Sequence, residues 1–126
     1  MTTINTELPA WLDIRLKRGA DLTVQWTWYA GGVGVDFTNA TGRIMIADAC
    51  GNESPLITTT PSSYGVVVLG TAGAGTSGTG SFTFAKPVTQ ILPNARQTYD
   101  FYVDWPDGTS TCVLTGTLSL LPGSPY

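Results

Sequence analysis

The sequence of 126 residues contains no histidine. Catalytic sites that use a Ser-His-Asp or Cys-His arrangement, and metal sites built on imidazole, are therefore excluded. Charged residues are scarce as well, at 12% of the chain, with six basic side chains against nine acidic ones. So few basic residues cannot form the extended positive surface that follows a phosphate backbone, so we expect no nucleic-acid partner.

Long apolar runs and abundant cysteine are also missing. No run reaches the ~18 consecutive apolar residues that a membrane-spanning helix needs, so we expect no membrane partner. Residues 1–10 lack the basic and apolar regions of a secretion signal, which predicts that the chain is made and assembled in a cytoplasm. For such a chain, we expect Cys50 and Cys112 to be buried free thiols, and a disulfide between them is the alternative.

Glycine, proline, threonine and serine are plentiful, while good helix formers are few. The 15 glycines and 8 prolines punctuate the chain, and 42% of its residues are apolar. This mixture favours an all-β domain over a helical one. The length is that of one domain with one core.

The strongest strand signal is the stretch from Asp21 to Tyr29. Its residues alternate strictly between apolar and polar, which is the period of a β-strand with one buried face. We expect this strand to lie at the centre of the core and its polar side chains to face water or a partner. The apolar set is Leu22, Val24, Trp26 and Trp28, and the polar set is Thr23, Gln25 and Thr27.

Similar patterns predict the rest of the fold. The N-terminal residues 1–10 show no alternation and are predicted to be an arm, residues 11–121 a single domain, and residues 122–126 a tail. A helical turn is expected within residues 87–95. The fold class predicted is a single immunoglobulin-like β-sandwich of about seven to nine antiparallel strands, with a small closed barrel as the alternative. The further strands predicted are residues 11–16, 43–47, 56–60, 64–69, 81–86, 97–105 and 110–120.

Two details of these strands are specific enough to test. Three consecutive valines at residues 66–68 predict a strand that is covered on both faces. In the last strand, Cys112 has the same parity as Leu114 and Leu118, which predicts that its side chain faces the core.

The carboxylates offer little for catalysis. Asp100 and Asp104 share a strand face but lie about 13 Å apart along an extended chain, farther than a glycosidase acid/base pair requires. Asp48, Asp104 and Asp107 could group oxygens around calcium, but they lack the dense spacing of a dedicated loop. The glycine-rich residues 73–80 lack the lysine of a phosphate-binding loop. We therefore expect no enzyme, no metal and no cofactor.

Three aromatic residues are candidates for a surface contact. Trp26 and Trp28 share the parity of the apolar set and are predicted to lie in the core. Trp11, Tyr29 and Tyr102 have the opposite parity to the inward set or lie at strand ends. Exposed aromatic side chains of this kind contact proteins or stack on sugars.

Five segments together resemble small virion proteins of tailed bacteriophages. The pattern is similar to the N-terminal domain of upper-baseplate proteins and spans nearly the whole of residues 11–121. Lys17 and Arg18 stand where that pattern has a glutamine before the glycine, and Phe37 replaces a leucine. The segments are LDIRLKRGADLTVQWTW from Leu12, VDFTNATGRIMI from Val35, GSFTF from Gly80, YDFYV from Tyr99 and GTLSL from Gly116.

The resemblance implies a non-enzymatic structural protein located in the virion. Such a protein acts by contacts with other virion proteins and is expected to form homo-oligomers. The placement expected is a tail or baseplate component, or one that attaches fibres. The alternative is a capsid decoration (cement) protein that bridges major capsid subunits. A carbohydrate-binding module for host recognition is a further alternative.

Overall fold

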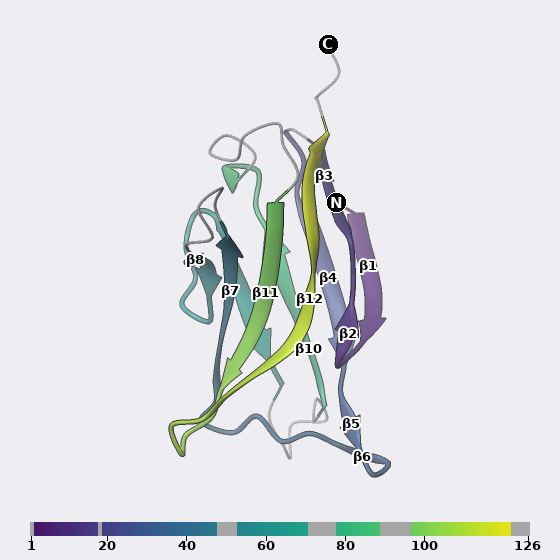
Figure 1. Ribbon diagram of the computed structural model, residues 1–126, viewed down its shortest axis with the longest axis vertical. Coiled ribbons are helices and arrows are strands. Elements are labelled where there is room, and N and C mark those ends of the chain that lie inside the picture. Colours follow the sequence, from purple (N-terminus) through teal and green to yellow (C-terminus); the bar gives the residue numbers. More distant parts are fainter. Residues whose placement is uncertain (1, 18, 48–52, 71–77, 89–96, 122–126) are drawn as a thin grey trace.

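The structure is a computed structural model that describes residues 2–17, 19–47, 53–70, 78–88 and 97–121. Two β-sheets face each other, and a short hairpin projects at one end (Figure 1). Sheet A has the order β1 (Thr2–Glu7), β4 (Leu22–Thr27), β10 (Thr79–Phe84) and β9 (Gly65–Leu69). Sheet B contains β8 (Glu53–Thr58), β7 (Thr41–Ala47), β11 (Gln97–Asp104) and β12 (Ser110–Leu121), with β2 (Ala10–Trp11) and β3 (Ile14–Lys17) both beside β12. The hairpin is formed by β5 (Tyr29–Ala30) and β6 (Val33–Gly34).

The predicted all-β sandwich is confirmed, and the described strands do not close into a barrel. Most strand pairs are antiparallel, as expected, but β1 runs parallel to β4, and both β2 and β3 run parallel to β12. The path of the chain explains the first of these. After β1 the chain crosses to sheet B, where β2 and β3 carry it back to the end at which β1 began. The next strand, β4, therefore starts beside the start of β1.

The N-terminal segment differs from the arm expected there, because Thr2–Glu7 form strand β1 of sheet A. The strand pairs with β4 in unbroken register from Thr2 opposite Leu22 to Glu7 opposite Thr27. Ile4 packs against the core, and Leu8, just beyond the strand, is 6% exposed. The segment therefore belongs to the sandwich through its backbone pairing and two apolar side chains.

The tryptophan strand β4 lies at the centre of sheet A, and the core side of its alternation is confirmed. Trp26 is 2% exposed, and its ring centroid lies 5.6 Å from that of Phe101 on the opposite sheet. Its indole N–H has no hydrogen-bond partner among the described residues, and the ring packs against Phe37 and Phe101. Gly80 lies opposite Trp26 in the sheet, and a Cβ there would come within 2.4 Å of the indole. The glycine therefore gives the large ring its room.

In β10 and β11 the apolar residues at alternate positions are buried, as in strands with one inward face, whereas β9 is not covered on both faces as predicted. Val67 is 1% exposed but Val68 is 51% exposed, so the strand is not covered on both faces. The reason is its position. Because sheet A is one of only two layers, one face of β9 packs against the core and the other faces outward.

The inward face predicted for Cys112 is wrong, and this side chain is exposed. Phe101 lies opposite Leu114 but the next residue, Tyr102, lies opposite Cys112, so Val113 is an extra residue on β12. Such a β-bulge inverts the parity of everything before it on the strand. As a result Val113 and Leu114 are both buried, and Cys112 faces outward. Cys50 lies outside the described residues.

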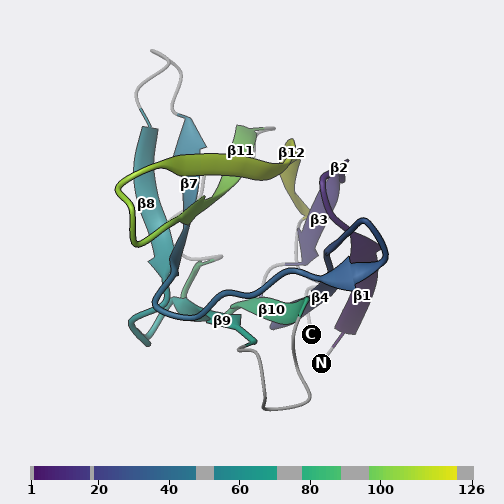
Figure 2. The ribbon, with the colours of Figure 1, turned by 90° about the horizontal axis from the view of Figure 1, so that it is seen from below.

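An aromatic cluster closes the core at the hairpin end of the sandwich. The segment after β6 crosses from sheet A to sheet B below the strands (Figure 2), and its Phe37 is 1% exposed. The Phe37 ring stacks on Trp105 with centroids 6.0 Å apart. The ring centroid of Trp28, the residue after β4, lies 5.9 Å from that of Trp105, so Trp28 caps the core while staying half-buried.

Two other predicted features fall mainly on residues that are not described. The helical turn within residues 87–95 is described only at Pro87 and Val88, and Val88 is fully buried. Most of the glycine-rich run, at residues 71–77, is likewise outside the described part. Within the part of the chain that is described, no helix is long and apolar enough to cross a membrane.

Candidate interaction surfaces

Trp11 projects from β2 on the outer face of sheet B. Its side chain is 64% exposed, and its indole N–H donates a hydrogen bond of 3.0 Å to Asp13 Oδ1. The same carboxylate oxygen accepts a 2.7 Å hydrogen bond from the Thr117 hydroxyl on β12. The ring is therefore held in one orientation while most of its surface stays available, as the sequence predicts for a contact residue.

Tyr29 lies on the projecting hairpin and is 57% exposed. Val33, on the returning strand, is 69% exposed. The turn between the strands consists of Gly31 and Gly32, whose φ angles are 61° and 79°. Positive φ at both positions is the geometry of a tight two-residue hairpin turn, which glycine adopts without strain. The glycine cluster in the sequence thus predicts the turn, but the exposure of Val33 was missed.

The base of this hairpin is fixed by three backbone hydrogen bonds. Val35 N–H donates to Trp28 O at 3.0 Å, Trp28 N–H donates to Gly78 O at 2.6 Å, and Gly78 N–H donates to Val35 O at 2.8 Å. Gly78 is required at this position because its φ is +77° and a Cβ would lie 2.7 Å from the Cα of Gly34. The exposed apolar side chains therefore project from a firmly attached base.

Tyr102, the third candidate, is half-buried on the outer face of β11. The guanidinium carbon of Arg43 lies 4.5 Å from the centre of its ring, so one ring face is covered. Arg43 also forms an ion pair with Asp104, with Nε 2.9 Å from Oδ2, and the Ser110 hydroxyl donates to Asp104 Oδ1 at 2.6 Å. The hydrogen bond from Arg43, followed by that from Ser110, lowers the pKa of Asp104 below its ordinary value.

These three predicted contact residues lie on three different elements, β2, β5 and β11. None of them lines either of the two hollows described next. The structure therefore offers separate contact points and not one concave aromatic surface.

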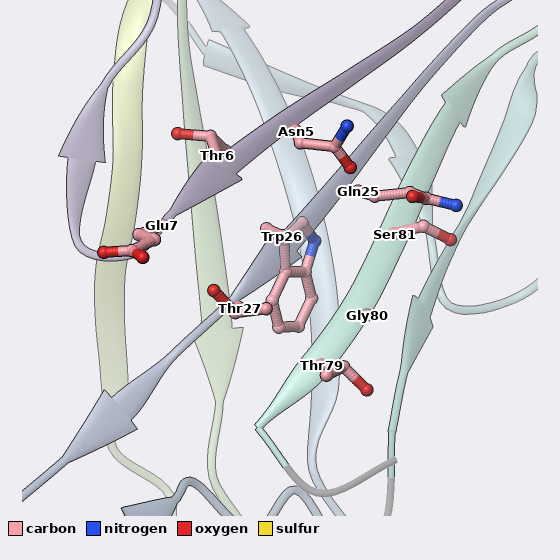
Figure 3. Close-up of a pocket in the computed structure, with 9 residues that line it drawn as sticks. All are labelled: Asn5, Thr6, Glu7, Gln25, Trp26, Thr27, Thr79, Gly80 and Ser81. Atoms are coloured by element: carbon pink, nitrogen blue, oxygen red, sulfur yellow. The ribbon is translucent and has the colours of Figure 1, made fainter. Parts of the chain in front are cut away.

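A polar trough of about 580 Å³ runs over sheet A (Figure 3). Three consecutive residues from each of β1, β4 and β10 line it, and the register aligns them in rows across the strands. The side chains of the two outer rows face away from the core. One outer row is Asn5, Gln25 and Ser81, and the other is Glu7, Thr27 and Thr79; the middle row is Thr6, Trp26 and Gly80.

The trough can hydrogen-bond to a polar partner but is not equipped for chemistry. Its six outward side chains are amides, hydroxyls and one carboxylate, that of Glu7. The sequence pattern predicted that Gln25 and Thr27 face water or a partner. It missed Asn5 and Glu7, since it treated their segment as an arm. The only signal for them is the weak alternation of Ile4 and Thr6 with Asn5 and Glu7.

A second hollow, of about 360 Å³, lies beside β9 and is mainly apolar. It is bordered by the exposed Val68 on the strand and by Phe37 and Pro61 from the neighbouring segments. Val68, which the sequence pattern predicted to be covered, thus lines an open apolar groove.

The carboxylates named in the sequence each have a local role or lie outside the described part. Asp100 accepts a 2.6 Å hydrogen bond from the Thr115 hydroxyl, and Asp107 accepts one of 2.6 Å from the Thr109 hydroxyl. Asp48 is not described. In the described ranges, no three Cys, Asp or Glu side chains are grouped closely enough to hold a metal ion.

No protein-family model matches the sequence, and no curated protein matches it either. Among solved structures, the chain is similar to the N-terminal domain of phage TP901-1 ORF48, with a TM-score of 0.51 and 10% sequence identity. The match covers 95% of this chain and 98% of that chain. At this identity the likeness is one of fold, and it agrees with the β-sandwich predicted from the sequence pattern and with the resemblance to phage proteins: this chain has the β-sandwich fold of a phage protein domain.

Proposed function

We propose that the chain is a non-enzymatic structural component of a tailed-phage particle, placed in the tail or baseplate and acting by contacts with other virion proteins. The observation that carries the proposal is the shared fold, since the similar phage domain is matched over 98% of its length. The sequence resemblance to upper-baseplate proteins points in the same direction. The chain is then located in the virion after assembly in the host cytoplasm.

The exposed groups fit a protein that works by contact. Tyr29 and Val33 project from a hairpin with a fixed base, and Trp11 is held in place with most of its ring exposed. Exposed apolar and aromatic side chains on a rigid support are typical of protein interfaces, because they bury surface without first having to be ordered. We propose the hairpin tip as the main contact with a neighbouring virion protein, with Trp11 and Tyr102 as further contacts.

The two alternatives make different demands on the structure. A carbohydrate module needs an aromatic ring exposed in a hollow, and the one aromatic residue lining the polar trough, Trp26, is 2% exposed. The geometry therefore gives sugar binding less support. A capsid decoration protein would use the same kinds of exposed groups, so only its location distinguishes it.

Location in the particle tests the proposal directly. Particles carrying an epitope-tagged copy of the chain would be purified and separated into heads and tails, and the chain would be quantified in each fraction and traced by cryo-electron microscopy. We expect it in the tail fraction, in density at the baseplate or fibre junction. Density on the capsid lattice would replace the tail placement with the decoration role. Absence from purified particles would overturn the structural role altogether.

A variant of the hairpin tests the proposed contact. Changing Tyr29→Ser together with Val33→Ser removes two exposed apolar side chains without touching the core, so we expect normal folding and at least a tenfold loss of incorporation, as for a contact that contributes more than about 1.4 kcal/mol. The matched control is Tyr64→Ser, which changes another exposed tyrosine that lines neither hollow. Equal incorporation of the hairpin variant and the control would contradict the proposed contact.

A further inference from the structure

Strand β1 is the edge of sheet A, and the structure shows which of its backbone groups face outward. Leu8 N–H donates a 2.7 Å hydrogen bond to Thr27 O, so the backbone of Leu8 faces β4. Backbone groups of alternate residues in a strand point to opposite sides. Thr6 and Ile4 therefore face β4 as well, whereas the N–H and C=O groups of Glu7, Asn5 and Thr3 point away from it, along the free edge of the sheet.

Among the described residues, this edge has few of the features that normally prevent a further strand from adding. Proteins protect sheet edges with proline, with charged side chains (most often lysine), with a bulge or with a covering segment. Strand β1 contains no proline, lysine or arginine, its one charged residue, Glu7, is at its end, and its register with β4 is unbroken. The other described edges are protected or very short. β8 contains Pro55 and a register shift, β3 carries Arg15 and Lys17, and β9 lies next to β7 and β8. β2, β5 and β6 have two residues each.

The sequence of β1 is compatible with a second copy of itself. When two such strands run antiparallel with Ile4 opposite Ile4, every residue faces a residue of the same parity, so both sheets keep their inner faces on the same side. Ile4 is only half-buried at the edge, and its counterpart would cover it. The charged Glu7 side chains of the two copies would lie on the order of 20 Å apart, so they would not repel.

We propose that β1 of one copy pairs antiparallel with β1 of a second copy, which joins the two four-stranded sheets into one continuous sheet across a two-fold axis. The inference does not rest on the virion role, because it concerns the chain alone. About four backbone hydrogen bonds would form, two in each of the two facing Thr3–Asn5 pairs. This contact is smaller than the ~800 Å² per partner of a standard interface, so the dimer forms weakly and its amount depends on concentration.

Substitution at Asn5 tests the pairing through its backbone. Asn5→Pro removes an N–H group that faces the partner and leaves the groups that face β4 in place; edge strands tolerate proline in that orientation. The control, Asn5→Thr, keeps the N–H group. Dissociation constants would be measured by sedimentation velocity over a concentration series, with circular dichroism to verify folding. We expect dimerisation to weaken about tenfold or more for Asn5→Pro and to stay near the native value for the control.

A charge swap tests the register without altering the backbone. In the proposed dimer the two copies of residue 5 are diagonal neighbours on the outer face, roughly 7–8 Å apart. Asn5→Lys alone and Asn5→Asp alone would each place like charges together, and we expect each to weaken dimerisation by about two- to fivefold. An equimolar mixture of the two variants would restore dimers that contain one copy of each.

A wild-type chain that stays monomeric at every concentration would overturn the proposal, and so would a dimer that Asn5→Pro leaves unchanged. A monomeric chain whose incorporation into particles is nevertheless lost in Asn5→Pro would show that the edge receives a strand from a different protein. That result would refute the second copy as partner and leave the virion role standing.

Discussion

Tyr99 shows how one buried hydroxyl joins β11 to the link between β2 and β3, although neither of those strands pairs with β11. Its side chain is 1% exposed, and its hydroxyl donates a 2.6 Å hydrogen bond to the carbonyl oxygen of Leu12. Gly116 lies opposite Tyr99 on β12, and a Cβ there would be 2.0 Å from that same oxygen. The missing side chain at residue 116 lets the N-terminal chain approach closely enough to receive the bond.

The ionisation of Tyr99 makes this bond testable through pH. Burial raises the pKa of Tyr99, and the nearby Asp13 and Asp100 carboxylates raise it further. Below pH ~10, where an unfolded tyrosine is protonated, the stabilisation is complete; above it the unfolded chain loses its proton first, so the free energy of unfolding falls as pH rises.

The corresponding variant is Tyr99→Phe. At pH 7 we expect the free energy of unfolding to fall by about 0.5–1.5 kcal/mol, because one hydrogen bond to a buried carbonyl is lost. Urea unfolding followed between pH 7 and 11 checks both effects. The native chain should lose stability above pH ~10, and the variant should lose less. Parallel alkaline curves for the two chains would assign the loss to other groups.

Parity along a strand predicts which residues lie in the core until the register shifts. Tyr99, Phe101 and Val103 are all buried, as their alternation predicts. The prediction for Cys112 was wrong because a bulge depends on how two strands fit together. The extra residue, Val113, lies between Cys112 and Leu114, and three apolar residues in a row do not show where the parity changes. Trp28 was predicted to lie in the core and is half-buried there. It is less buried than Trp26 because it is the last residue of the alternating run.

Among the elements, β1 is the one that the sequence pattern did not reveal. Its single clearly apolar residue, Ile4, is too weak a signal for alternation, and its partner β4 lies about twenty residues away. Backbone pairing along all six residues gives the segment its order. Short edge strands of this kind are specified by the sheet they join and not by their own side chains.

Removal of β1 should therefore cost stability as well as contacts. A chain lacking residues 1–8 loses the buried Leu8 and the partly buried Ile4, and we expect its free energy of unfolding to fall by at least ~2 kcal/mol. Thermal and urea unfolding would measure the difference, and Leu8→Ala in the full chain gives the share that is due to that side chain. A truncated chain as stable as the full one would return the segment to the role of an arm.

For the molecule as a whole, local patterns predict the architecture but not the order of the strands. Alternation and turn residues identify a sandwich, because each strand carries its own buried face. The parallel pairing of β1 with β4 and of β3 with β12 depends on contacts between distant parts of the chain, which no local pattern records. The candidate surfaces likewise divide into those that a local pattern predicts and those that depend on the assembled fold. Trp11 and Tyr29 are exposed, as predicted, and their role as contacts stays a prediction, while the polar trough required the assembled sheet.

Because of the path of the chain, the resistance of the sandwich to force should depend on the direction of pulling. Thr2 lies opposite Leu22 and Leu121 opposite Lys17, so β1 starts and β12 finishes at one end of the molecule, away from the hairpin (Figure 1). Tension between those two points pulls across the strand ends and separates β1 from β4 one hydrogen bond at a time. Tension between Thr2 and Gly108, in the turn at the opposite end, pulls along the strands and loads many bonds together.

In single-molecule pulling we expect the chain to unfold at lower force when it is pulled between Thr2 and Leu121 than when it is pulled between Thr2 and Gly108. If the chain is held in an assembly through both of its ends, the hydrogen bonds of β1 are the first to give way under strain.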